Sequence, residues 1–537
     1  MKLESELQCD VLIVGSGIAG LQAADAASEK GARVILISQG ELFSGASFYP
    51  GTWGFGLIAP DGENDKKDLA ESIQIVGEGM ADPLLVEAFV NGIDPGIESL
   101  RRNGLIPMEA RDKQQSEFIP CFDRKHRHWM GLSKEAIKIF FGKRLMDKNV
   151  RILSNTVLLD LTEIGQRIDG AIVYHQKRIM WIKSGSVVLA TGGLSGLYQS
   201  RLTTEDVSSF CHWVALKVGA QAVNLEFQQF MPGYIEPAFG TVFNEKAFQW
   251  SELLNANGET LFDENRDLYN RRSTHGPFTY SLGDYGIDFA ILSERYHGGI
   301  RLRYRSDIEK NMPEFSKTYF EWLHQKYGMT VKDIIKIGMF AHASNGGICI
   351  DSYGYTGVPG LYAAGEITGG MHGANRIGGL STANGIVFGK AAGEYAAQSG
   401  KLSSRGYVIV EPKGNDNVLE ITRKIREIMD TSSFPKRNQH DLNQGIAEME
   451  RLKERLRCGC GQGTGSKSDE ICAKTQVAQA QINTALCVLK AELLREESRG
   501  SHFRMDYPDK NVNMNFPIRI RAVNGEVEAW FDKTVRR

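Results

Sequence analysis

A glycine-rich turn near the start of the chain carries the clearest chemical signal. The run Gly15-Ser-Gly17-Ile-Ala-Gly20 follows a continuous apolar stretch over residues 9–14 and precedes a helical pattern that continues to Ala27. In a strand–turn–helix unit of this kind, the first glycine permits a tight turn, the second lets the backbone approach a pyrophosphate, and the third lets the helix pack on the strand. The phosphates then lie at the positively polarised N-terminus of the helix. The spacing therefore predicts a dinucleotide-binding site.

The end of the next predicted strand argues against a plain nicotinamide site. Gly31 is expected to stop the first helix, and the apolar run over residues 33–37 then ends in Ser38 and Gln39. An acidic residue at this point would bind the ribose hydroxyls of a nicotinamide dinucleotide. Because that residue is absent, a nicotinamide cofactor is less expected here.

Two more apolar stretches also end in glycine. Residues 186–190 run into Thr191-Gly192-Gly193, and residues 361–364 run into Gly365-Glu366. Loops that follow parallel strands open onto the same edge of a sheet, so these junctions and the first one are expected to meet in one crevice. The dinucleotide-binding domain would then be discontinuous, built from residues 1–225 and 341–405.

Three other segments are expected to frame this domain. Residues 226–340 mix aromatic and charged residues with weak strand signals, which indicates an inserted α+β capping domain that contributes to the substrate site. Apolar residues at spacings of three and four dominate residues 417–497 and predict a helical bundle over 415–500, whose last helix ends at Gly500. In the tail, residues 501–537, alternation around Asn524-Gly525 predicts a hairpin. The expected fold class is α/β, a discontinuous Rossmann-like domain with this cap and bundle.

The composition excludes several classes of partner. The 537 residues suffice for about two to four domains, and 63 Lys and Arg balance 65 Asp and Glu, so no global field favours nucleic acid or an anionic membrane. The first ten residues lack the pattern of a secretory signal, and no apolar run reaches about 18 residues. A cytoplasmic protein without a membrane span is expected. Glycine, with 58 residues, makes up about 11% of the chain against a usual value of about 7%.

The eight cysteines do not form a metal-binding pattern. They are scattered without a CxxC pair, and Cys458, Cys460 and Cys472 lack the usual spacing between thiolate ligands. Reduced thiols and no metal site are therefore expected.

Several segments together carry a family resemblance. The run His372-Gly-Ala-Asn375-Arg376, preceded by the glycine-rich stretches at 342–347 and 360–366, resembles the signature of the succinate dehydrogenase, fumarate reductase and L-aspartate oxidase flavoproteins. Residues 495–508 are similar to the C-terminal helical domain of the same superfamily, so the resemblance covers nearly the whole chain. The length, the Ser38-Gln39 strand end and the stretch 44–48 look most like L-aspartate oxidase and its soluble relatives.

The resemblance implies FAD as the cofactor of the Rossmann-like domain. The histidine that attaches flavin covalently in part of the family is expected within residues 44–48 and is absent there, which implies non-covalent FAD. The residues implied in cofactor binding are Gly15, Gly17, Ile18, Ala19, Gly20, Ser38, Gln39, Ser44, Gly45, Ala46, Ser47, Ala190, Thr191, Gly192, Gly193, Gly365, Glu366, Asn375, Arg376 and Ser381.

The implied chemistry is hydride transfer between flavin N5 and a substrate carbon adjacent to a carboxylate or carbonyl, for which the protein supplies position, charge and a proton. Arg376 can hold a carboxylate bidentately, and His342 and His372 are donors that titrate near neutrality. By resemblance, His342 and Arg376 bind the substrate carboxylate, and Glu366 lies at the FAD ribose or nearby. A purely structural histidine is the alternative interpretation at His342 and at His372.

Departures from the family pattern concern the substrate residues. Met231 occupies the place of a second substrate histidine, Trp250 lies where an Arg-Gly-Glu-Gly stretch is expected, and no arginine stands beside Asp284 and Tyr285. These changes suggest a substrate with one carboxylate or carbonyl and an apolar or aromatic body next to Met231, Trp250 and Tyr285. Fumarate and aspartate would then be poor substrates.

The proton donor is left with three candidates, Tyr285, Arg272 and His275. The alternative interpretation of Arg266, Arg271 and Arg272 is that they are solvated surface charges.

The leading functional hypothesis is an FAD-dependent oxidoreductase that acts on a small-molecule acid or enone. A second hypothesis is L-aspartate oxidase itself, favoured by length and layout but opposed by Met231 and the missing arginine. A third is a flavoprotein electron-transfer subunit of an iron–sulfur complex. Because the sequence has no cluster ligands, an iron–sulfur or other electron-transfer partner would have to bring them.

Overall fold

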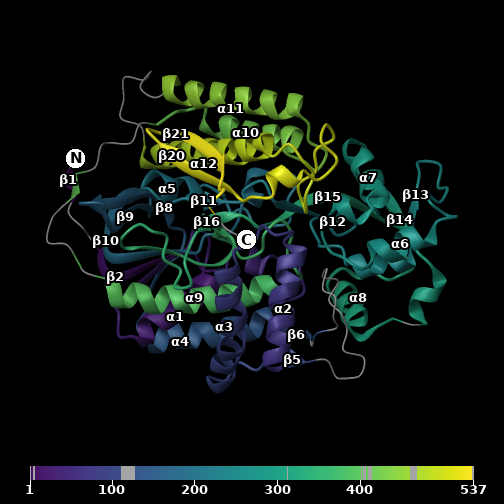
Figure 1. The fold of residues 1–537 in the computed structure, drawn as a ribbon. Coiled ribbons are helices and arrows are strands. Elements are labelled where there is room, and N and C mark those ends of the chain that lie inside the picture. Colours follow the sequence, from purple (N-terminus) through teal and green to yellow (C-terminus); the bar gives the residue numbers. More distant parts are fainter. Residues whose placement is uncertain are drawn as a thin grey trace.

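The structure is a computed structural model that describes residues 2–3, 7–109, 127, 129–310, 312–400, 402, 407–408, 414–459 and 468–534. Cys460, one of the three cysteines weighed as thiolate ligands, lies outside these residues. A central sheet holds the N-terminal half together, with helices below it and the C-terminal helices above it in Figure 1. Residues that are far apart in the sequence approach each other at the ends of its strands. No helix in the described part of the chain combines the length and the apolar character needed to cross a bilayer.

The central sheet has the order β7-β3-β2-β10-β9-β8, and β17 also pairs with β10. Its strands are β2 (Leu7–Val14), β3 (Val34–Ile37), β7 (Arg151–Leu153), β8 (Val157–Ile164), β9 (Arg167–His175), β10 (Arg178–Leu189) and β17 (Leu361–Ala363). Strands β2, β10 and β17 are parallel, and their last residues, Val14, Leu189 and Ala363, stand in register. The prediction that three strand–glycine junctions meet at one edge is confirmed.

Helices cover the lower face of this sheet. They are α1 (Ile18–Glu29), α2 (Gly62–Val76), α3 (Pro83–Arg102), α4 (Lys134–Asp147) and α9 (Leu380–Ser399). In α9 two glycines pack directly on α1, since a Cβ at Gly389 would lie 2.6 Å from Ala19 O and one at Gly393 would lie 2.2 Å from Ala23 O. Part of the glycine excess therefore serves close helix packing.

Residues 228–344 form a four-stranded antiparallel sheet in the order β12-β15-β14-β13. The strands are β12 (Gln228–Glu236), β13 (Ser251–Leu254), β14 (Ile300–Tyr304) and β15 (Ile335–Ser344), accompanied by α6 (Arg266–Arg272), α7 (Gly286–Ser293) and α8 (Glu314–Tyr327). This unit lies to one side of the central sheet (Figure 1). The expected α+β character of this segment is confirmed, although its strand signals in the sequence are weak.

The C-terminal region contains the predicted bundle, α10 (Val418–Ser432), α11 (Gln439–Gly459) and α12 (Asp469–Leu494). The prediction that Gly500 ends the last helix is wrong, because α12 ends at Leu494 and Arg495 turns into an extended conformation. The Arg495 guanidinium is bound there by Glu226, with Nε 2.7 Å from Oε1. The predicted hairpin is confirmed: β20 (Ile518–Val523) and β21 (Glu526–Phe531) pair around Asn524 and Gly525, whose φ angles are +52° and +81°.

Three smaller sheets complete the fold. A five-stranded sheet joins the hairpin to β11 (Ala222–Val223), β16 (Gly347–Cys349) and β18 (Thr368–Gly369), and a three-stranded sheet contains β4 (Phe55–Ile58), β5 (Met108–Glu109) and β6 (Trp129–Leu132). Strands β1 (Lys2–Leu3) and β19 (Tyr407–Val408) form a short pair, and α5 (Cys211–Lys217) lies between the central sheet and α12.

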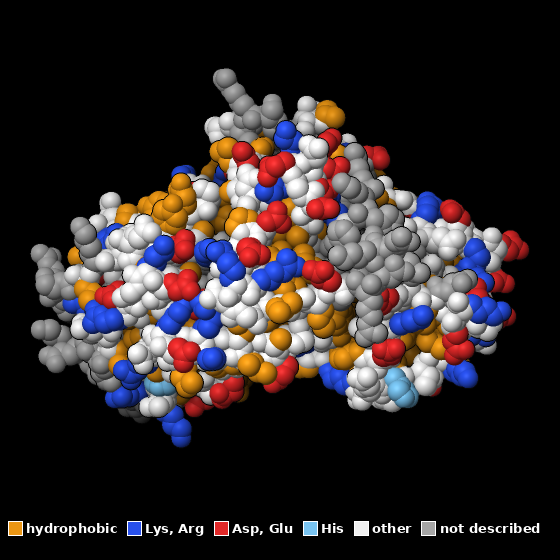
Figure 2. Space-filling view, turned by 90° about the horizontal axis from the view of Figure 1, so that it is seen from below, with side chains coloured by type: hydrophobic (Ala, Val, Ile, Leu, Met, Phe, Trp, Pro, Cys, Tyr) orange, Lys and Arg blue, Asp and Glu red, His pale blue; other side chains and the backbone are white. Residues whose placement is uncertain are grey.

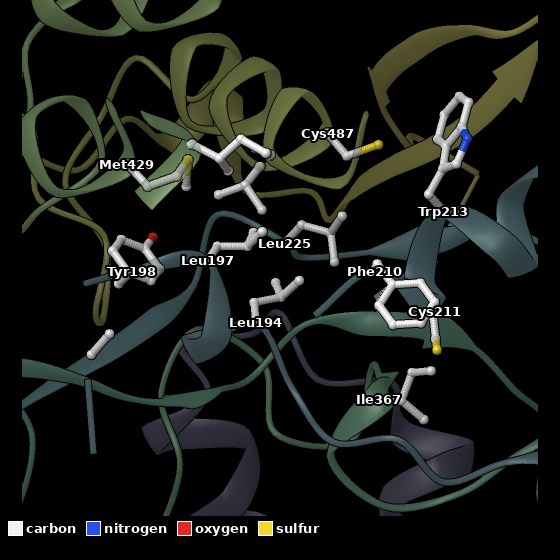
Figure 3. Packing of buried hydrophobic residues seen from close by; sticks show 14 of the residues in the cluster. Leu194, Leu197, Tyr198, Phe210, Cys211, Trp213, Leu225, Ile367, Met429 and Cys487 are labelled. Atoms are coloured by element: carbon white, nitrogen blue, oxygen red, sulfur yellow. The ribbon is translucent and has the colours of Figure 1, made fainter. Parts of the chain in front are cut away.

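Figure 3 shows the core that joins these parts. Tyr198, Phe210 and Trp213 from the sheet side are buried together with Met429 of α10 and Cys487 of α12. Burial of apolar surface stabilises the folded state by roughly 25 cal/mol for each Å² removed from water. The bundle is therefore part of the main core. On the face seen in Figure 2, side chains of both charges are interspersed with apolar ones.

Candidate active site

A cavity of about 300 Å³ lies at the strand edge where the glycine junctions meet. Of the residues implied in cofactor binding, those that line it are Gly15, Gly17, Ile18, Ala19, Ser38, Gln39, Ser44, Gly45, Ala46, Ser47, Ala190, Thr191, Gly192, Gly365, Glu366, Arg376 and Ser381. Gly20, Gly193 and Asn375 are not part of this lining. The cavity runs from the first βα turn to the start of α9, as a dinucleotide would require.

Three glycines at the cavity have steric roles, and two of them, Gly20 and Gly193, lie outside its lining. A Cβ at Gly20 would lie 1.9 Å from Gly15 O, which fits the expected close packing of helix on strand. Gly15 itself has φ +110°, and a Cβ there would lie 2.2 Å from Ala190 O on the neighbouring strand. A Cβ at Gly193 would lie 2.3 Å from Glu366 Oε1, so this glycine admits the carboxylate to its position.

The first turn of α1 is suited to an anion. This turn has no acidic residue, and the side chain that accepts from its Ile18 backbone N–H, at 3.1 Å, is the neutral Ser47 hydroxyl, so no negative charge in the turn neutralises its positive end. Where an acidic residue is missing after β3, the hydroxyls of Ser16, Ser38 and Ser44 lie within 2.8 to 3.1 Å of one another. Gln39 Oε1 accepts a hydrogen bond of 2.8 Å from Ser208. Neutral hydroxyls therefore replace the carboxylate at this end of the cavity.

The opposite end of the cavity carries Arg376. Its Nε donates to Gln229 Oε1 at 3.2 Å, and its guanidinium also contacts the Ser381 hydroxyl. Burial lowers the pKa of Arg376, while the carboxylates of Glu366 and Glu245 act in the opposite direction. The arginine stays protonated at neutral pH, because even a lowered guanidinium pKa lies far above 7.

His342 and Glu366 line the cavity with Arg376. Burial lowers the pKa of His342 to about 3, and the nearby charge of Arg376 adds to this effect, so the imidazole is neutral at pH 7. Its Nδ1 finds no hydrogen-bond partner among the described residues. Glu366 Oε1 accepts from the Ser344 backbone N–H at 3.0 Å, and burial raises the pKa of Glu366. His342 therefore lines the cavity as a neutral imidazole whose buried Nδ1 is unpaired among the described residues.

Two predicted residues next to Arg376 lie behind the lining. His372 is buried, with Nε2 3.5 Å from Asn384 Nδ2. Asn375 accepts from Gln229 Nε2 at 2.9 Å and donates to Thr279 at 2.8 Å. Asn375 is thus placed to orient the Arg376 loop. The buried position of His372 behind the lining fits the alternative interpretation of a structural histidine.

Met231 is buried in a small apolar cluster with Leu202 and Phe340. Leu202 lines the cavity, and so does Tyr49, which packs against the same cluster. Met231 is thus one layer behind the lining.

The other proposed substrate and proton-transfer residues lie elsewhere. Tyr285 stacks on Tyr280 with ring centroids 4.5 Å apart, and neither Tyr285 nor the buried Trp250 is part of the cavity lining. His275 is buried, with Nε2 2.8 Å from Asp284 Oδ2. These positions do not support an apolar substrate body next to Trp250 and Tyr285, because both side chains pack against other residues outside the cavity lining.

The interpretation of Arg272 as a solvated surface charge is wrong. Its side chain is fully buried and forms a bidentate ion pair with Asp288, with distances of 2.8 and 2.9 Å. The surface interpretation holds for Arg271, which is exposed and pairs with Asp267. Neighbours on a short helix thus differ because only one of them faces the core of the cap.

Several lining residues are missed by motif reasoning. The segment from Asp206 to Cys211 borders the cavity, and Asp206 Oδ2 accepts from the Gly45 backbone N–H at 2.9 Å. This segment contains neither glycine nor a regular period, so the sequence holds no signal for it. Tyr49, Thr52, Phe55, Thr156 and Leu158 also line the cavity.

Glu245 is a second group that sequence reasoning missed. It is buried in the 3-10 helix Glu245–Trp250, and its Oε1 finds no hydrogen-bond partner among the described residues. Burial raises the pKa of Glu245 to about 8, although Arg272 and Arg376 both oppose the rise. Glu245 therefore lies close enough to both arginines to interact with them electrostatically.

Comparisons with known proteins agree with this architecture. Residues 10–382 match the family described as FAD binding domain, and residues 422–527 match the family described as fumarate reductase flavoprotein C-term. The first match covers more than half of the chain and contains every lining residue of the cavity except Gly385.

Relatives extend over nearly the full chain. The chain is 26% identical to one component of the fumarate reductase (CoM/CoB) of Methanothermobacter marburgensis, covering 94% of this chain and 96% of that protein. It is also 26% identical to the L-aspartate oxidase of Pseudomonas aeruginosa, covering 98% and 100%. The structure of E. coli quinol fumarate reductase FrdA superposes with a TM-score of 0.79 at 22% identity, covering 98% of this chain and 97% of that one. The chain therefore belongs to the FAD-binding flavoproteins of the fumarate reductase, succinate dehydrogenase and L-aspartate oxidase type, and it is an FAD-dependent oxidoreductase.

Proposed function

We propose that this chain catalyses hydride exchange between FAD and a substrate carbon adjacent to a carboxylate or carbonyl. The observation that carries the proposal is the position of Arg376, a permanent cation, beside the neutral His342 in the same cavity as the glycine junctions. When bound, FAD supplies the two-electron chemistry. The chain itself has to hold the substrate, orient it and handle one proton.

The cavity fits a non-covalently held FAD. Gly15, Gly17 and the first turn of α1 would hold the pyrophosphate, and the serine hydroxyls near Ser38 would face the adenosine ribose. The cysteine of the lining, Cys211, has a pKa raised by burial to about 12, which keeps it protonated and poorly reactive. We expect acid precipitation of the purified protein to release all flavin into the supernatant. Flavin that stays with the precipitate would contradict non-covalent binding.

Arg376 and His342 are proposed to bind the substrate carboxylate or carbonyl together. The guanidinium can donate two hydrogen bonds to a carboxylate, and its contacts with Gln229 and Ser381 already orient it. The neutral ring of His342 adds a donor or acceptor without a second charge. The two groups would hold the reacting carbon in one orientation, which is the main catalytic contribution of a binding residue.

Glu245 is proposed to hold the proton that accompanies hydride transfer. At pH 7 its raised pKa keeps the carboxyl mainly protonated, and it interacts with Arg376 at the substrate position. Tyr285, His275 and Arg272 are less suited, since they are engaged with Tyr280, Asp284 and Asp288 respectively. Glu245 lies outside the cavity lining as they do, but its Oε1 has no hydrogen-bond partner among the described residues.

The test is reoxidation of the reduced enzyme under anaerobic conditions by a panel of unsaturated acids and ketones. We expect at least one acid to reoxidise the flavin, and Arg376→Gln to lower kcat/KM by about 10² to 10³-fold, because a buried charge partner is removed. Arg271→Gln is the matched control, since that exposed arginine pairs only with Asp267, and its kcat/KM should not change. A flavin-containing Arg376→Gln protein with full activity would refute the assigned role.

The relatives favour two further candidates. L-aspartate oxidase is favoured by the end-to-end match with the Pseudomonas protein; hydrogen peroxide formed from L-aspartate under air would establish it, and its absence would dismiss it. A place in a larger electron-transfer complex is favoured because the Methanothermobacter relative is named as one of the subunits of its enzyme. Co-purification of an iron–sulfur protein with the tagged chain would support that candidate.

A further inference from the structure

The cavity contains one permanent cation. Among the described residues that line it, Arg376 is the only arginine or lysine, and the neutral His342 adds no charge. The lining also includes two carboxylates, Asp206 and Glu366. A dianionic substrate would therefore bring a second negative charge into a site that offers no second cation.

An apolar wall stands next to Arg376. Gln229, which orients the guanidinium, lies on β12 two residues before Met231, a separation of about 7 Å along a strand. Met231 packs with Leu202 and Phe340, and Leu202 hydrogen-bonds through its backbone N–H to Ala341 O, directly beside His342. Gln229 and Met231 are thus two residues apart on β12, and Phe340 and His342 are two residues apart on β15.

The apolar wall continues toward solvent. Phe340 contacts Phe239 edge to face, with centroids 6.0 Å apart, and Phe239 is 75% exposed. The loop that carries Phe239 is fastened to the cavity by the Tyr49 hydroxyl, which donates to Gly240 O. An apolar group that extends from the site would pass along this wall.

Other cations near the site are already engaged. The Arg201 guanidinium donates to Tyr198 O at 2.8 Å and pairs with Glu205, and Arg272 is paired with Asp288. Lys134 Nζ donates to Tyr49 O and Thr52 O.

One further donor near the wall is uncharged. This donor is Asn244, and its neighbour Phe243 donates a backbone hydrogen bond to Pro232 O. The Nδ2 of Asn244 has no hydrogen-bond partner among the described residues. An amide can bind a hydroxyl or carbonyl, but it cannot neutralise a second carboxylate. Burial of an unpaired carboxylate against this wall would be strongly unfavourable.

We propose that the substrate is a monocarboxylic acid with an apolar body, of the 2-enoic acid class or its saturated counterpart, and not a four-carbon dicarboxylic acid. This inference rests on the proposed function of the same cavity. In the reductive direction the C2–C3 double bond is lost: one carbon gains a hydride, which carries the two electrons taken from the reduced cofactor, and the other carbon gains a proton from the protein. The cofactor is left oxidised, and the reverse reaction balances in the same way.

The test mixes the photoreduced holoprotein under argon with cinnamate, crotonate, fumarate or 2-cyclohexenone, and follows the return of oxidised flavin absorbance. We expect kcat/KM for cinnamate and crotonate to exceed that for fumarate at least 30-fold, and cyclohexenone to react more slowly than both monoacids. A higher kcat/KM for fumarate than for cinnamate and crotonate would overturn the inference. A faster reaction with cyclohexenone than with the two monoacids would also overturn it. If ferricyanide reoxidises the flavin but none of the four compounds does, the proposed function itself fails.

Two variants of Met231 sharpen the test. Met231→His introduces a polar donor into the wall and should lower the cinnamate-to-fumarate ratio of kcat/KM about tenfold, whereas Met231→Leu keeps an apolar side chain of similar size and should leave the ratio unchanged. An unchanged ratio in a flavin-containing Met231→His protein would overturn the inference. If that variant fails to fold, the oxidised wild-type protein is titrated with 3-phenylpropanoate and with succinate. Tighter binding of succinate would overturn the inference.

Discussion

At the scale of single residues, burial sets the protonation states in the candidate site. The imidazole of His342 is driven toward its neutral form, with a pKa of about 3, while the carboxyl of Glu245 is driven toward its neutral form, with a pKa of about 8. Arg376 keeps its charge although it is desolvated, because a guanidinium does not lose its proton near neutral pH. Arg376 is therefore the one cation among the described lining residues at neutral pH, and it stands beside a neutral imidazole.

Glu245 makes stability depend on pH. Its folded pKa of about 8 lies above the ordinary value of 4.5 that applies when it is exposed. The folded state binds the proton more tightly, so the contribution of this group to the free energy of unfolding is fully present below about pH 4.5 and is lost as pH rises through 8. We expect Glu245→Gln to flatten this decline. Urea denaturation of both proteins between pH 5 and 9 measures it, and parallel pH profiles would contradict the raised pKa.

At the scale of elements, the site depends on strand ends and on the segment after α12. The ends of β2, β10 and β17 bring three glycine junctions to one edge. The segment that follows α12 supports the Arg376 loop, since the backbone N–H of Ser501 donates to Ala374 O at 3.1 Å and the Ser501 hydroxyl donates to the same oxygen at 3.2 Å. The cofactor end is thus built from three strand ends that are far apart in the sequence, and the substrate end is supported by the C-terminal segment.

The first glycine junction can be tested with a matched pair of variants. Gly15→Ala places a Cβ 2.2 Å from Ala190 O, so we expect FAD to be lost on purification. Gly31 also has a positive φ, +82°, but nothing lies within 4 Å of a Cβ there. Gly31→Ala should cost about 1 to 3 kcal/mol of backbone strain and retain FAD. The flavin-to-protein absorbance ratio measures both, and a Gly15→Ala protein with full flavin content would contradict the steric argument.

The support of the Arg376 loop can be tested in the same way. A Cβ at Gly500 would lie 2.4 Å from Ala374 O, so Gly500→Ala should displace the loop and lower kcat/KM about tenfold or more while FAD remains bound. Gly525, in the exposed hairpin turn, has φ +81° and no atom within 4 Å of a Cβ. Gly525→Ala should therefore keep its activity. Equal activity of the two variants would show that the contact with Ala374 is not needed.

At the scale of the whole molecule, a buried ionic network joins the helical bundle to the rest. Arg495 pairs with Glu226 at 2.7 Å and with Glu497 at 2.8 Å, and Arg437 pairs with Glu492 at 3.1 Å, all five side chains being fully buried. Glu226 lies two residues before the first residue of β12, the strand that carries Gln229 and Met231, so the network anchors the start of the cap. In Figure 1 the bundle lies over the central sheet, on the side opposite α1 and α9.

Breaking this network should be costly. Arg495→Met leaves Glu226 buried without its partner, while Glu497 keeps Arg499, and we expect the loss to lower the free energy of unfolding by about 3 to 5 kcal/mol. Arg521→Met removes half of an exposed pair with Glu528 and should cost less than about 1 kcal/mol. Urea denaturation of the holoproteins compares them. A similar loss in both variants would contradict the dominance of buried charges.

Local patterns predict the cofactor half of the site well. Each strand–glycine junction depends on a few consecutive residues, and Gly15, Gly192 and Gly365 do meet in one cavity. The cap is harder to predict, because periodicity does not say which polar residues are turned inward. Arg272 and Arg271 are neighbours in the chain, yet one is fully buried against Asp288 and the other is exposed.

By itself, the sequence determined the family, the βαβ unit, the helical bundle and the terminal hairpin, because turns, periods and signature motifs act over short distances along the chain. Only the tertiary structure decided which side chains face the substrate. It placed Leu202, Met231 and Phe340 in one cluster, moved Tyr285 and Trp250 away from the cavity, and brought Glu245 near Arg376. The physical reason is that burial and charge pairing arise between residues that the fold brings together, such as Glu245 and Arg376, and no local spacing encodes them.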